Sequence, residues 1–514
     1  MAEPTAADAT STDPGGSRYD RDTSRTAALL DARIREHARR HGERPALVVV
    51  NRHGSVSVSW AELDAASGRL ADHLPSTAGS PFCSVTPLVN HDATELVALV
   101  ATMRVSAPTA VLNARLPAAL RDAHLSRVRE TGYVPVVSRT AAAPWPHAQR
   151  PTATKPPVVA LPPHAVLLAS GGSTGHSKLV IDHLIRSAPA RPEAVRPFLN
   201  TGWRAGQCQL VCSPLYHAAG LAPFVEGLVA GNTTVVAHPF DGSTVGTLIA
   251  GHAVDWVQMT PYHMASLLTG NAGPDSWKHA PTLVHLADRC PARVKRRFHA
   301  ALGARKVFEM YGASEGIGMT MARGDEWEER PGTVGRGFFT HLRVMDNTGR
   351  ILGPDEVGEV HMRAGVRQHG TYLGATGRLR VGPDGFATLG DTGHLDHAGY
   401  LYLAPRQLAT INVAGVTVSP SEVEAELSEH PQIADVAVCA QPDAAFGERV
   451  VAIVVPATAL TADEVRRWAI PRMAPAQVPS RYVFTAALPR ADTGKLDRTA
   501  LPALVRSDSP RQRE

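Results

Sequence analysis

Short apolar runs that have the pattern of strands alternate with segments of helical periodicity from Thr26 to Gly312. PALVVV at 45–50 has the pattern of a buried strand, whereas 59–74 repeats apolar residues every three or four positions. Further strand-like runs end in turn or polar residues at 164–170, 209–217, 233–238, 254–261 and 306–312. This alternation predicts an α/β domain whose ligands bind beyond the carboxyl ends of its strands.

The pattern changes after about Gly324. Hairpin-like runs at 377–381 and 386–389 flank a turn containing Asp384-Gly385, which predicts a β-rich subdomain. Beyond a boundary near 404–415, the chain predicts a compact α+β unit of two strands and two helices. Ser419 and Thr461 are the expected N-caps of these helices, each with a glutamate three residues later to complete a capping box.

Bulk composition excludes several classes of protein. Charged residues make up 19% of the 514 residues and the formal net charge is +4, as in ordinary soluble globular proteins. Basic residues are scattered, and their longest cluster, Lys295-Arg296-Arg297, favours a solvated helix face over a nucleic-acid site. The absence of a long apolar run argues against a membrane span. Five cysteines without a CxxC pair favour a reducing cytoplasm over a disulfide framework.

The segment Ser170–Lys178, SGGSTGHSK, follows one of the apolar runs. Its backbone N–H groups and hydroxyls could surround a phosphate, and the closing lysine adds a positive charge. It is not a Walker A motif, because His176 and Ser177 separate the last glycine from the lysine. Taken alone, the segment is equally compatible with a flexible connection. Only six lysines occur in the chain, which favours a role for Lys178 and for Lys495 in the glycine-containing turn ADTGKLDR.

Two carboxylates follow strand-like runs. Glu315 lies among small residues in YGASEG and suits a Mg²⁺ ligand that bridges to phosphates. Asp391 lies in the turn GDTGHLD, where a carboxylate could accept hydrogen bonds from a ribose diol. Each alone is more often a solvated glutamate or a turn aspartate, so their interpretation depends on the rest of the chain.

The order of these motifs resembles a known family. SGGSTGHSK, PLYHAAG, YGASEG, GDTGHLDHAGYLYL, Arg406, GVTVSPSEVEAEL and PRADTGKLDR occur in the order and spacing of the adenylate-forming superfamily of acyl-CoA synthetases, peptide-synthetase adenylation domains and luciferases. The resemblance covers about residues 26–503 and is greatest to bacterial CoA ligases for fatty, aromatic or steroid-type acids. It implies a large N-terminal domain of α/β sheets with a β-rich subdomain at 26–404, a hinge at 405–408 and a small mobile α+β domain at 409–505, between disordered tails at 1–25 and 506–514.

The resemblance also implies roles for individual residues. A mobile loop would contact the β- and γ-phosphates of ATP through Ser170, Gly171, Gly172, Ser173, Thr174, Gly175 and Lys178. Ser314 would contact the α-phosphate, Asp391 and Arg406 would hold the ribose, and the backbone of Met310, Tyr311 and Gly312 would flank the adenine and acyl groups. Glu315, with Thr174, would hold Mg²⁺. Lys495 would reach the α-phosphate, which makes Lys495, Glu315 and Thr174 the expected catalytic residues.

The acyl pocket is expected to include His217, Arg289, Met310, Gly312 and Gly318. Asp288-Arg289 replaces the small residues and proline of relatives, and an arginine in the pocket wall could bind an acidic substituent. The alternative is a surface ion pair between these two neighbours.

Near the hinge the sequence differs from its relatives, so the motifs do not decide which molecule accepts the acyl group. Leu408 and Ala409 replace polar or acidic residues, and Ala414 replaces a glycine expected beside the pantetheine tunnel. The leading hypothesis is an ATP- and Mg²⁺-dependent ligase that adenylates an aromatic or other hydrophobic acid and transfers it to CoA. Alternatives are a CoA-independent enzyme that adenylates an unusual acid such as nitrite for attack by an arylamine, and a non-catalytic nucleotide-binding relative. No nucleic-acid or membrane partner is expected.

Overall fold

The computed structural model describes residues 26–51, 54–74, 81–138, 161, 164–169, 178–190, 196–268, 273–277, 281–365, 371–373, 379–404, 410–413, 416–443, 447–491 and 494–507. Several of the sequence predictions lie outside these residues. They concern the loop at 170–177, the hinge at 405–408 with Arg406 and Leu408, the neighbouring Ala409 and Ala414, the tail at 1–25 and residues 508–514 of the C-terminal tail.

The described strands form four sheets. The largest has the order β14-β13-β12-β11-β10-β8-β9-β1-β2, with bounds β1 Pro45–Asn51, β2 Gly54–Ser59, β8 Cys208–Val211, β9 Thr233–Ala237, β10 Trp256–Met259, β11 Thr282–Leu286, β12 Val307–Gly312, β13 Met319–Arg323 and β14 Arg336–Gly337. The second has the order β17-β7-β6-β4-β3-β5, with bounds β3 Phe82–Leu88, β4 Thr109–Asn113, β5 Val134–Val137, β6 Val166–Ala169, β7 Leu179–Asp182 and β17 Thr371–Leu373.

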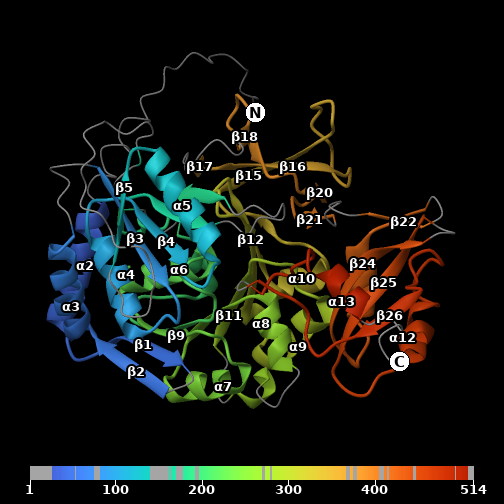
Figure 1. Cartoon of the computed structure of the whole chain (residues 1–514), viewed down its shortest axis with the longest axis horizontal. Helices are drawn as coiled ribbons and strands as arrows, with labels where there is room; N and C mark the ends of the chain where they lie inside the picture. The colour runs from blue at the N-terminus through green and yellow to red at the C-terminus, as the bar shows by residue number, and fades with distance from the viewer. Residues whose placement is uncertain are drawn as a thin grey trace, which may run out of the picture.

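The other two sheets follow later in the chain. The third contains β15 Thr340–Met345, β16 Gly358–Ala364, β18 Arg380–Val381, β19 Ala387–Thr388, β20 Thr392–Leu395 and β21 Leu401–Leu403. The fourth contains β22 Ile411–Val413, β23 Val416–Val418, β24 Ile433–Asp443, β25 Gly447–Pro456 and β26 Arg481–Phe484. The third sheet confirms the predicted β-rich subdomain, and the fourth lies to the right of the large sheets in Figure 1.

Helices cover the sheets. The large part is residues 26–404, with the first three sheets. Its helices are α2 Thr26–His41, α3 Trp60–Asp72, α4 Ala93–Arg104, α5 Ala118–Glu130, α6 Ala218–Ala230, α7 Gly242–Gly251, α8 Pro261–Leu268, α9 Ala292–Leu302 and α10 Gly324–Glu329. The small part is residues 410–507, with the fourth sheet. Its helices are α11 Pro420–Leu427, α12 Ala462–Ala469 and α13 Leu501–Ser507. Short 3₁₀ turns occur at Ala188–Ala190, Pro197–Thr201, Pro274–Ser276 and Ala304–Lys306. Among the described helices, none combines the length and apolar content that a membrane crossing needs.

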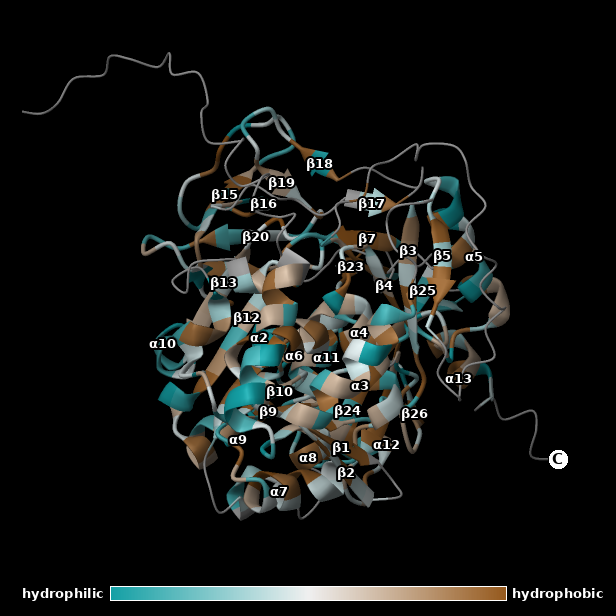
Figure 2. Cartoon of the chain, turned by 90° about the vertical axis from the view of Figure 1, so that its left-hand side faces the viewer, coloured by the Kyte–Doolittle hydropathy of each residue, from teal (hydrophilic) through white to brown (hydrophobic). Residues whose placement is uncertain are grey.

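Both faces of the largest sheet are buried, as the continuous apolar runs predict. One core joins α2, α3, α4 and α6 to the first two sheets, and a second core packs α7, α8 and α9 against the opposite face of the largest sheet. Figure 2 shows hydrophobic residues along strands such as β3 and β5 and hydrophilic residues on much of α2. The small sheet likewise carries α11 and α12 on one face and α13 on the other.

The two predicted capping boxes have different outcomes. Thr461 caps α12 as predicted, because its hydroxyl accepts from the Glu464 N–H and Glu464 accepts from the Thr461 N–H. The capping box at Ser419 is wrong: α11 begins at Pro420, yet Ser419 makes no side-chain cap hydrogen bond. The Glu422 carboxylate instead accepts a hydrogen bond from Gln477 at 3.2 Å, so a tertiary contact occupies the residue that would close the box.

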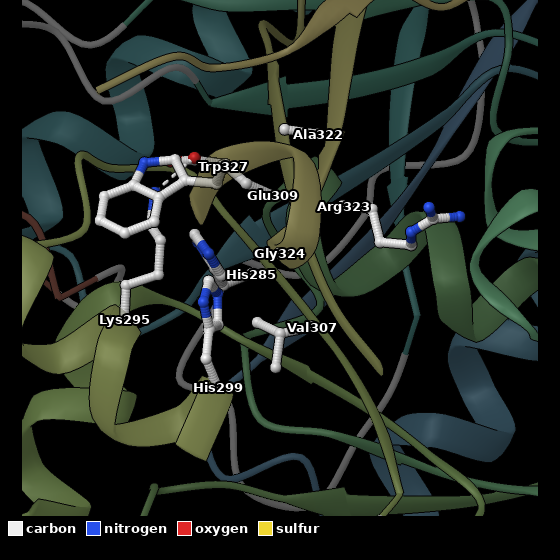
Figure 3. Close-up of a pocket in the computed structure, with 9 residues that line it drawn as sticks. All are labelled: His285, Lys295, His299, Val307, Glu309, Ala322, Arg323, Gly324 and Trp327. Atoms are coloured by element: carbon white, nitrogen blue, oxygen red, sulfur yellow. Dashed lines mark hydrogen bonds and ion pairs between the residues drawn. The ribbon is translucent and has the colours of Figure 1, made fainter. Parts of the chain in front are cut away.

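The basic cluster on α9 is not a uniformly solvated face, which corrects the interpretation from sequence. Arg296 and Arg297 are exposed, but Lys295 is only 4% exposed. Its ammonium donates to Glu309 on β12 at 2.6 Å and lies 4.5 Å from the ring centroid of Trp327. Figure 3 shows this ion pair, with His285 and His299 beside it. A buried ion pair therefore holds α9 against β12.

The small part docks on the large part through α8 and α9. Arg293 of α9 donates to the backbone carbonyls of Ser428 and Ile433 at 3.0 and 2.8 Å. Gly494 packs against Tyr262 of α8 so closely that a Cβ at Gly494 would lie 2.7 Å from the Tyr262 Cβ. Gly494 also has φ +78°, in the left-handed region that favours glycine.

We expect replacement of Glu309 by leucine to destabilise the large part by about 3–5 kcal/mol, because it leaves the Lys295 ammonium buried without its partner. Asp275→Ala, which breaks the exposed pair between Asp275 and Arg297, is the control and should cost at most about 1 kcal/mol. Chemical denaturation monitored by tryptophan fluorescence measures both changes. Equal costs for the two variants would contradict a dominant role for the buried pair.

Gly494→Ala should loosen the docked turn, since the added methyl group meets Tyr262. Gly399→Ala is the matched control: Gly399 has φ +79°, but a methyl group added there would meet no atom within 4 Å, so this variant carries the backbone strain of about 1–2 kcal/mol alone. Hydrogen–deuterium exchange should become faster in α8 only for Gly494→Ala. Unchanged exchange in α8 would show that the contact does not hold the turn in place.

Candidate functional site

The carboxyl ends of three neighbouring parallel strands meet at one edge of the largest sheet. β10 pairs with β11 and β11 with β12, all parallel, so the segments after Met259, Leu286 and Gly312 leave the sheet side by side. The chain after β12 then turns through Gly316 at φ 64° and Gly318 at φ 150°. A side chain at Gly318 would clash with Thr340, which explains the requirement for glycine there.

Tyr311 and Asp391 come together at this edge. Tyr311 is on β12, whereas Asp391 lies between β19 and β20 in the third sheet. The Tyr311 hydroxyl donates to Asp391 Oδ2 at 2.7 Å, and the Asp391 side chain is buried. Ser314, three residues after Tyr311, is half-buried. The fold thus joins two residues that the sequence indicated separately.

Glu315 and Lys178 are connected through Tyr372. The Tyr372 hydroxyl donates to Glu315 Oε1 at 2.7 Å, and Lys178 Nζ lies 4.6 Å from the centroid of the Tyr372 ring. Burial and the hydrogen bond to the Glu315 carboxylate raise the pKa of Tyr372, so its hydroxyl remains protonated as a donor. Tyr372 was not among the candidates from sequence. Its position depends on β17 pairing with β7, where Tyr372 faces Val180.

The Glu315 carboxylate suits a metal ion that enters together with a bound ligand. Within the described part of the chain, no cluster of three His, Cys, Asp or Glu side chains is arranged to hold a metal. Glu315 is a carboxylate with 9% exposure. Mg²⁺ commonly takes one or two protein carboxylates and completes its shell with water and substrate phosphates. Glu315 therefore fits a Mg²⁺ ion that a phosphorylated ligand brings in.

Thiol nucleophiles do not fit this chain. All five cysteines are free, and burial raises the pKa of Cys83, Cys208 and Cys290 to about 12. Burial also raises the pKa of Cys212 and Cys439. Because the thiolate is the reactive form, these raised pKa values disfavour the five cysteines as nucleophiles at neutral pH.

His217 lies at the start of α6, as its N-cap, in the segment that follows β8. The backbone of this segment is anchored by His91, whose Nε2 accepts from the Leu215 N–H at 2.8 Å. Burial, with His238 beside it, lowers the pKa of His91 well below its usual value, so the ring stays neutral and can accept this bond. His91 was missed from sequence, where it is one of 23 histidines.

Arg289 lies in a different environment from the remaining pocket candidates. It is exposed and lines a groove of about 580 Å³ between α9 and α11, together with Arg296 and the glutamates 422, 426 and 429. Met310 is buried on β12 and Gly312 is exposed at its end. The Asp288 carboxylate accepts from the backbone N–H of Arg289 at 2.8 Å.

Lys495 belongs to the small part, in a turn that packs on α8. It is exposed and immediately follows Gly494, which is buried against Tyr262 three residues beyond β10. The turn is closed by Ala491 N–H donating to the Lys495 carbonyl at 2.8 Å, and Arg490 donates to the Gly494 carbonyl at 2.7 Å. The remaining candidates, residues 170–175 and Arg406, lie outside the described residues.

Curated relatives of this chain include CoA ligases. The chain is 30% identical over 430 residues to 4-coumarate–CoA ligase-like 6 of Oryza sativa subsp. japonica. This alignment covers 78% of this chain and 70% of the relative. It is 29% identical to the sulfoacetate–CoA ligase of Cupriavidus necator over 57% of this chain, and there it spans just over half of the relative's length, 58%.

Solved structures share the fold. The o-succinylbenzoate CoA synthetase of Bacillus subtilis, in complex with its acyl-adenylate intermediate, matches with a TM-score of 0.69 at 23% identity, over 91% of this chain and 97% of that one. The same synthetase is also known in complex with ATP and a magnesium ion. A family model described as AMP-binding enzyme matches residues 34–368, and one described as AMP-binding enzyme C-terminal domain matches residues 422–495. The chain therefore belongs to the family of AMP-binding enzymes.

Proposed function

We propose that this protein activates a carboxylic acid with ATP, releases pyrophosphate and transfers the acyl group from the adenylate to CoA. The observation that carries the proposal is the contact of Tyr311 with Asp391 and of Glu315 with Tyr372 and Lys178 beside the end of β12. The Lys495 turn packs on Tyr262, three residues beyond β10. Membership of the AMP-binding enzyme family and the CoA ligases among its relatives support it.

In the first half-reaction, an oxygen of the acid forms a bond to the α-phosphorus and the bond to the pyrophosphate oxygen breaks. Negative charge develops on the phosphoryl oxygens, and a fixed cation stabilises it. We assign this role to Lys495, whose charge acts without proton transfer. Lys178 and residues 170–175 hold the leaving phosphates, while Ser314 contacts the α-phosphate.

In the second half-reaction the CoA sulfur bonds to the acyl carbon, AMP leaves and the thiol proton is released.

The nucleoside is assigned to Asp391, Arg406 and the backbone of Met310, Tyr311 and Gly312. The hydrogen bond from Tyr311 orients the Asp391 carboxylate, and a carboxylate has enough lone pairs to accept from a ribose hydroxyl as well. Glu315, with Thr174, is assigned to Mg²⁺, which supplies charge neutralisation of the phosphates when bound.

We propose an aromatic or other hydrophobic acid as substrate, bound beside His217, Met310 and Gly318. The CoA ligases for hydrophobic acids among the relatives support this substrate class. Met310 itself packs in a buried apolar cluster with Trp256 and Val284, and Gly318 packs closely against Thr340. Arg289 is proposed to bind an acidic substituent of the acid, and it lines the groove between α9 and α11. The domain limits 26–404 and 409–505, with a hinge at 405–408, remain part of the proposal.

Lys495→Ala should lower acid-dependent pyrophosphate release by roughly 10²–10³, as removal of one preorganised charge-stabilising group does in other enzymes. Lys306→Ala, which removes a lysine from the 3₁₀ turn before β12, should leave the rate unchanged. A coupled pyrophosphate assay over a panel of aryl, fatty and steroid acids measures both. Release by no acid in the panel would refute adenylation of these acids, and an unchanged rate in Lys495→Ala would refute the role of Lys495.

The acceptor is tested separately. With the best acid from the panel, mass spectrometry should detect an acyl-CoA thioester only when CoA is present, together with AMP in equal amount. Nitrite with an arylamine, offered without CoA, should yield no product. Product formation that does not require CoA would contradict the second half-reaction while leaving the first intact.

A further inference from the structure

Tyr372 contacts both charged groups of the proposed phosphate and metal site. It is on β17, an edge strand that pairs antiparallel with β7, and Leu373 faces Leu179 next to Lys178. Its ring lies under the Lys178 ammonium, with 4.6 Å between Nζ and the ring centroid. Its hydroxyl donates to Glu315 Oε1 at 2.7 Å. The Tyr372 side chain thus contacts Lys178, which precedes β7, and Glu315, which follows β12.

Packing alone does not account for a tyrosine at this position. A phenylalanine would keep the ring, its contact with Lys178 and the strand pairing. The hydroxyl adds a hydrogen bond to a carboxylate that is only 9% exposed. Among the described residues, Tyr372 provides the one hydrogen bond found to the Glu315 side chain, and it occupies a single carboxylate oxygen. The other oxygen keeps its lone pairs for a further ligand.

A carboxylate that binds a metal ion benefits from a fixed orientation. Hydrogen bonds to the ligand from outside the metal's own shell supply this orientation, and their loss typically weakens metal binding by 10- to 100-fold. The Tyr372 hydroxyl meets this description. The cation above the ring adds a second constraint, because Lys178 approaches the electron-rich face of the same side chain.

We propose that Tyr372 is a positioning residue that orients Glu315 toward the divalent metal ion entering with ATP and keeps Lys178 beside the same site. The inference rests on the proposed function, since it assigns metal binding to Glu315. It adds the means by which residues from two different sheets are aligned before the nucleotide arrives.

The test separates the hydroxyl from the ring. In the full chain, Tyr372→Phe removes the hydrogen bond to Glu315 and retains the contact with Lys178, whereas Tyr372→Leu removes both. Mn²⁺ serves as the probe for Mg²⁺ and is titrated by electron paramagnetic resonance in the presence of a non-hydrolysable ATP analogue. Tyr372→Phe should weaken Mn²⁺ binding about 10- to 100-fold and leave analogue binding without metal unchanged. Tyr372→Leu should weaken both.

The control is a tyrosine–carboxylate pair elsewhere in the chain. Tyr400 donates to Glu326 at 2.9 Å, so Tyr400→Phe removes the same kind of hydrogen bond and should leave Mn²⁺ binding unchanged. In a Glu315→Gln background, Tyr372→Phe should have no further effect on Mn²⁺ binding, because the ligand that it orients is absent. Thermal melts check that each variant is folded.

Three results would overturn the inference. Mn²⁺ binding to Tyr372→Phe equal to that of the unmodified protein would remove the positioning role, while analogue binding and pyrophosphate release by the unmodified protein would keep the proposed function. An equal effect of Tyr372→Phe with and without the Glu315 carboxylate would show that the hydroxyl acts by another route. Failure of the unmodified protein to bind the analogue at all would reject the proposed function together with the inference.

Discussion

Parallel pairing of β10, β11 and β12 is the constraint on which the site depends. Strands in this arrangement end at the same edge, so the segments that follow them are neighbours although they are distant in sequence. The end of β12 and the backbone that follows it carry Tyr311 to Gly318, and Tyr262 of α8, after β10, packs against the Lys495 turn. The two cores that cover the sheet on both faces keep these strands in register.

Helix α9 links this sheet to the small part. Lys295 binds Glu309 of β12 on its buried side, while Arg293 donates to carbonyls at the end of α11 and the start of β24. These two side chains are two residues apart on α9. Lys295 contacts the strand that carries Tyr311, and Arg293 contacts the small part, which carries Lys495. A buried ammonium needs its partner, so the ion pair restricts how α9 can shift against β12. The helix therefore sets where the small part can dock.

Local patterns predicted much of the fold. Apolar runs gave the right strands for 45–50, 233–238 and 306–312, and the capping box at Thr461 is present. Predictions failed where long-range contacts decide. Glu422 bonds to Gln477 rather than completing the cap at Ser419, and Lys295 is buried by the ion pair with Glu309 although its neighbours are charged. Such contacts join residues far apart in sequence, and no local pattern records them.

The sequence by itself determined the α/β class, the β-rich subdomain, the family and the candidates Tyr311, Glu315 and Asp391, because ordered motifs and strand periodicity are local properties of the chain. Only the tertiary structure decided that Tyr311 bonds to Asp391, that Tyr372 joins Glu315 to Lys178, and that Arg289 faces α11. The physical reason is that side chains meet through sheet pairing and helix packing, and the partner of a strand such as β17 lies far back along the chain, at β7.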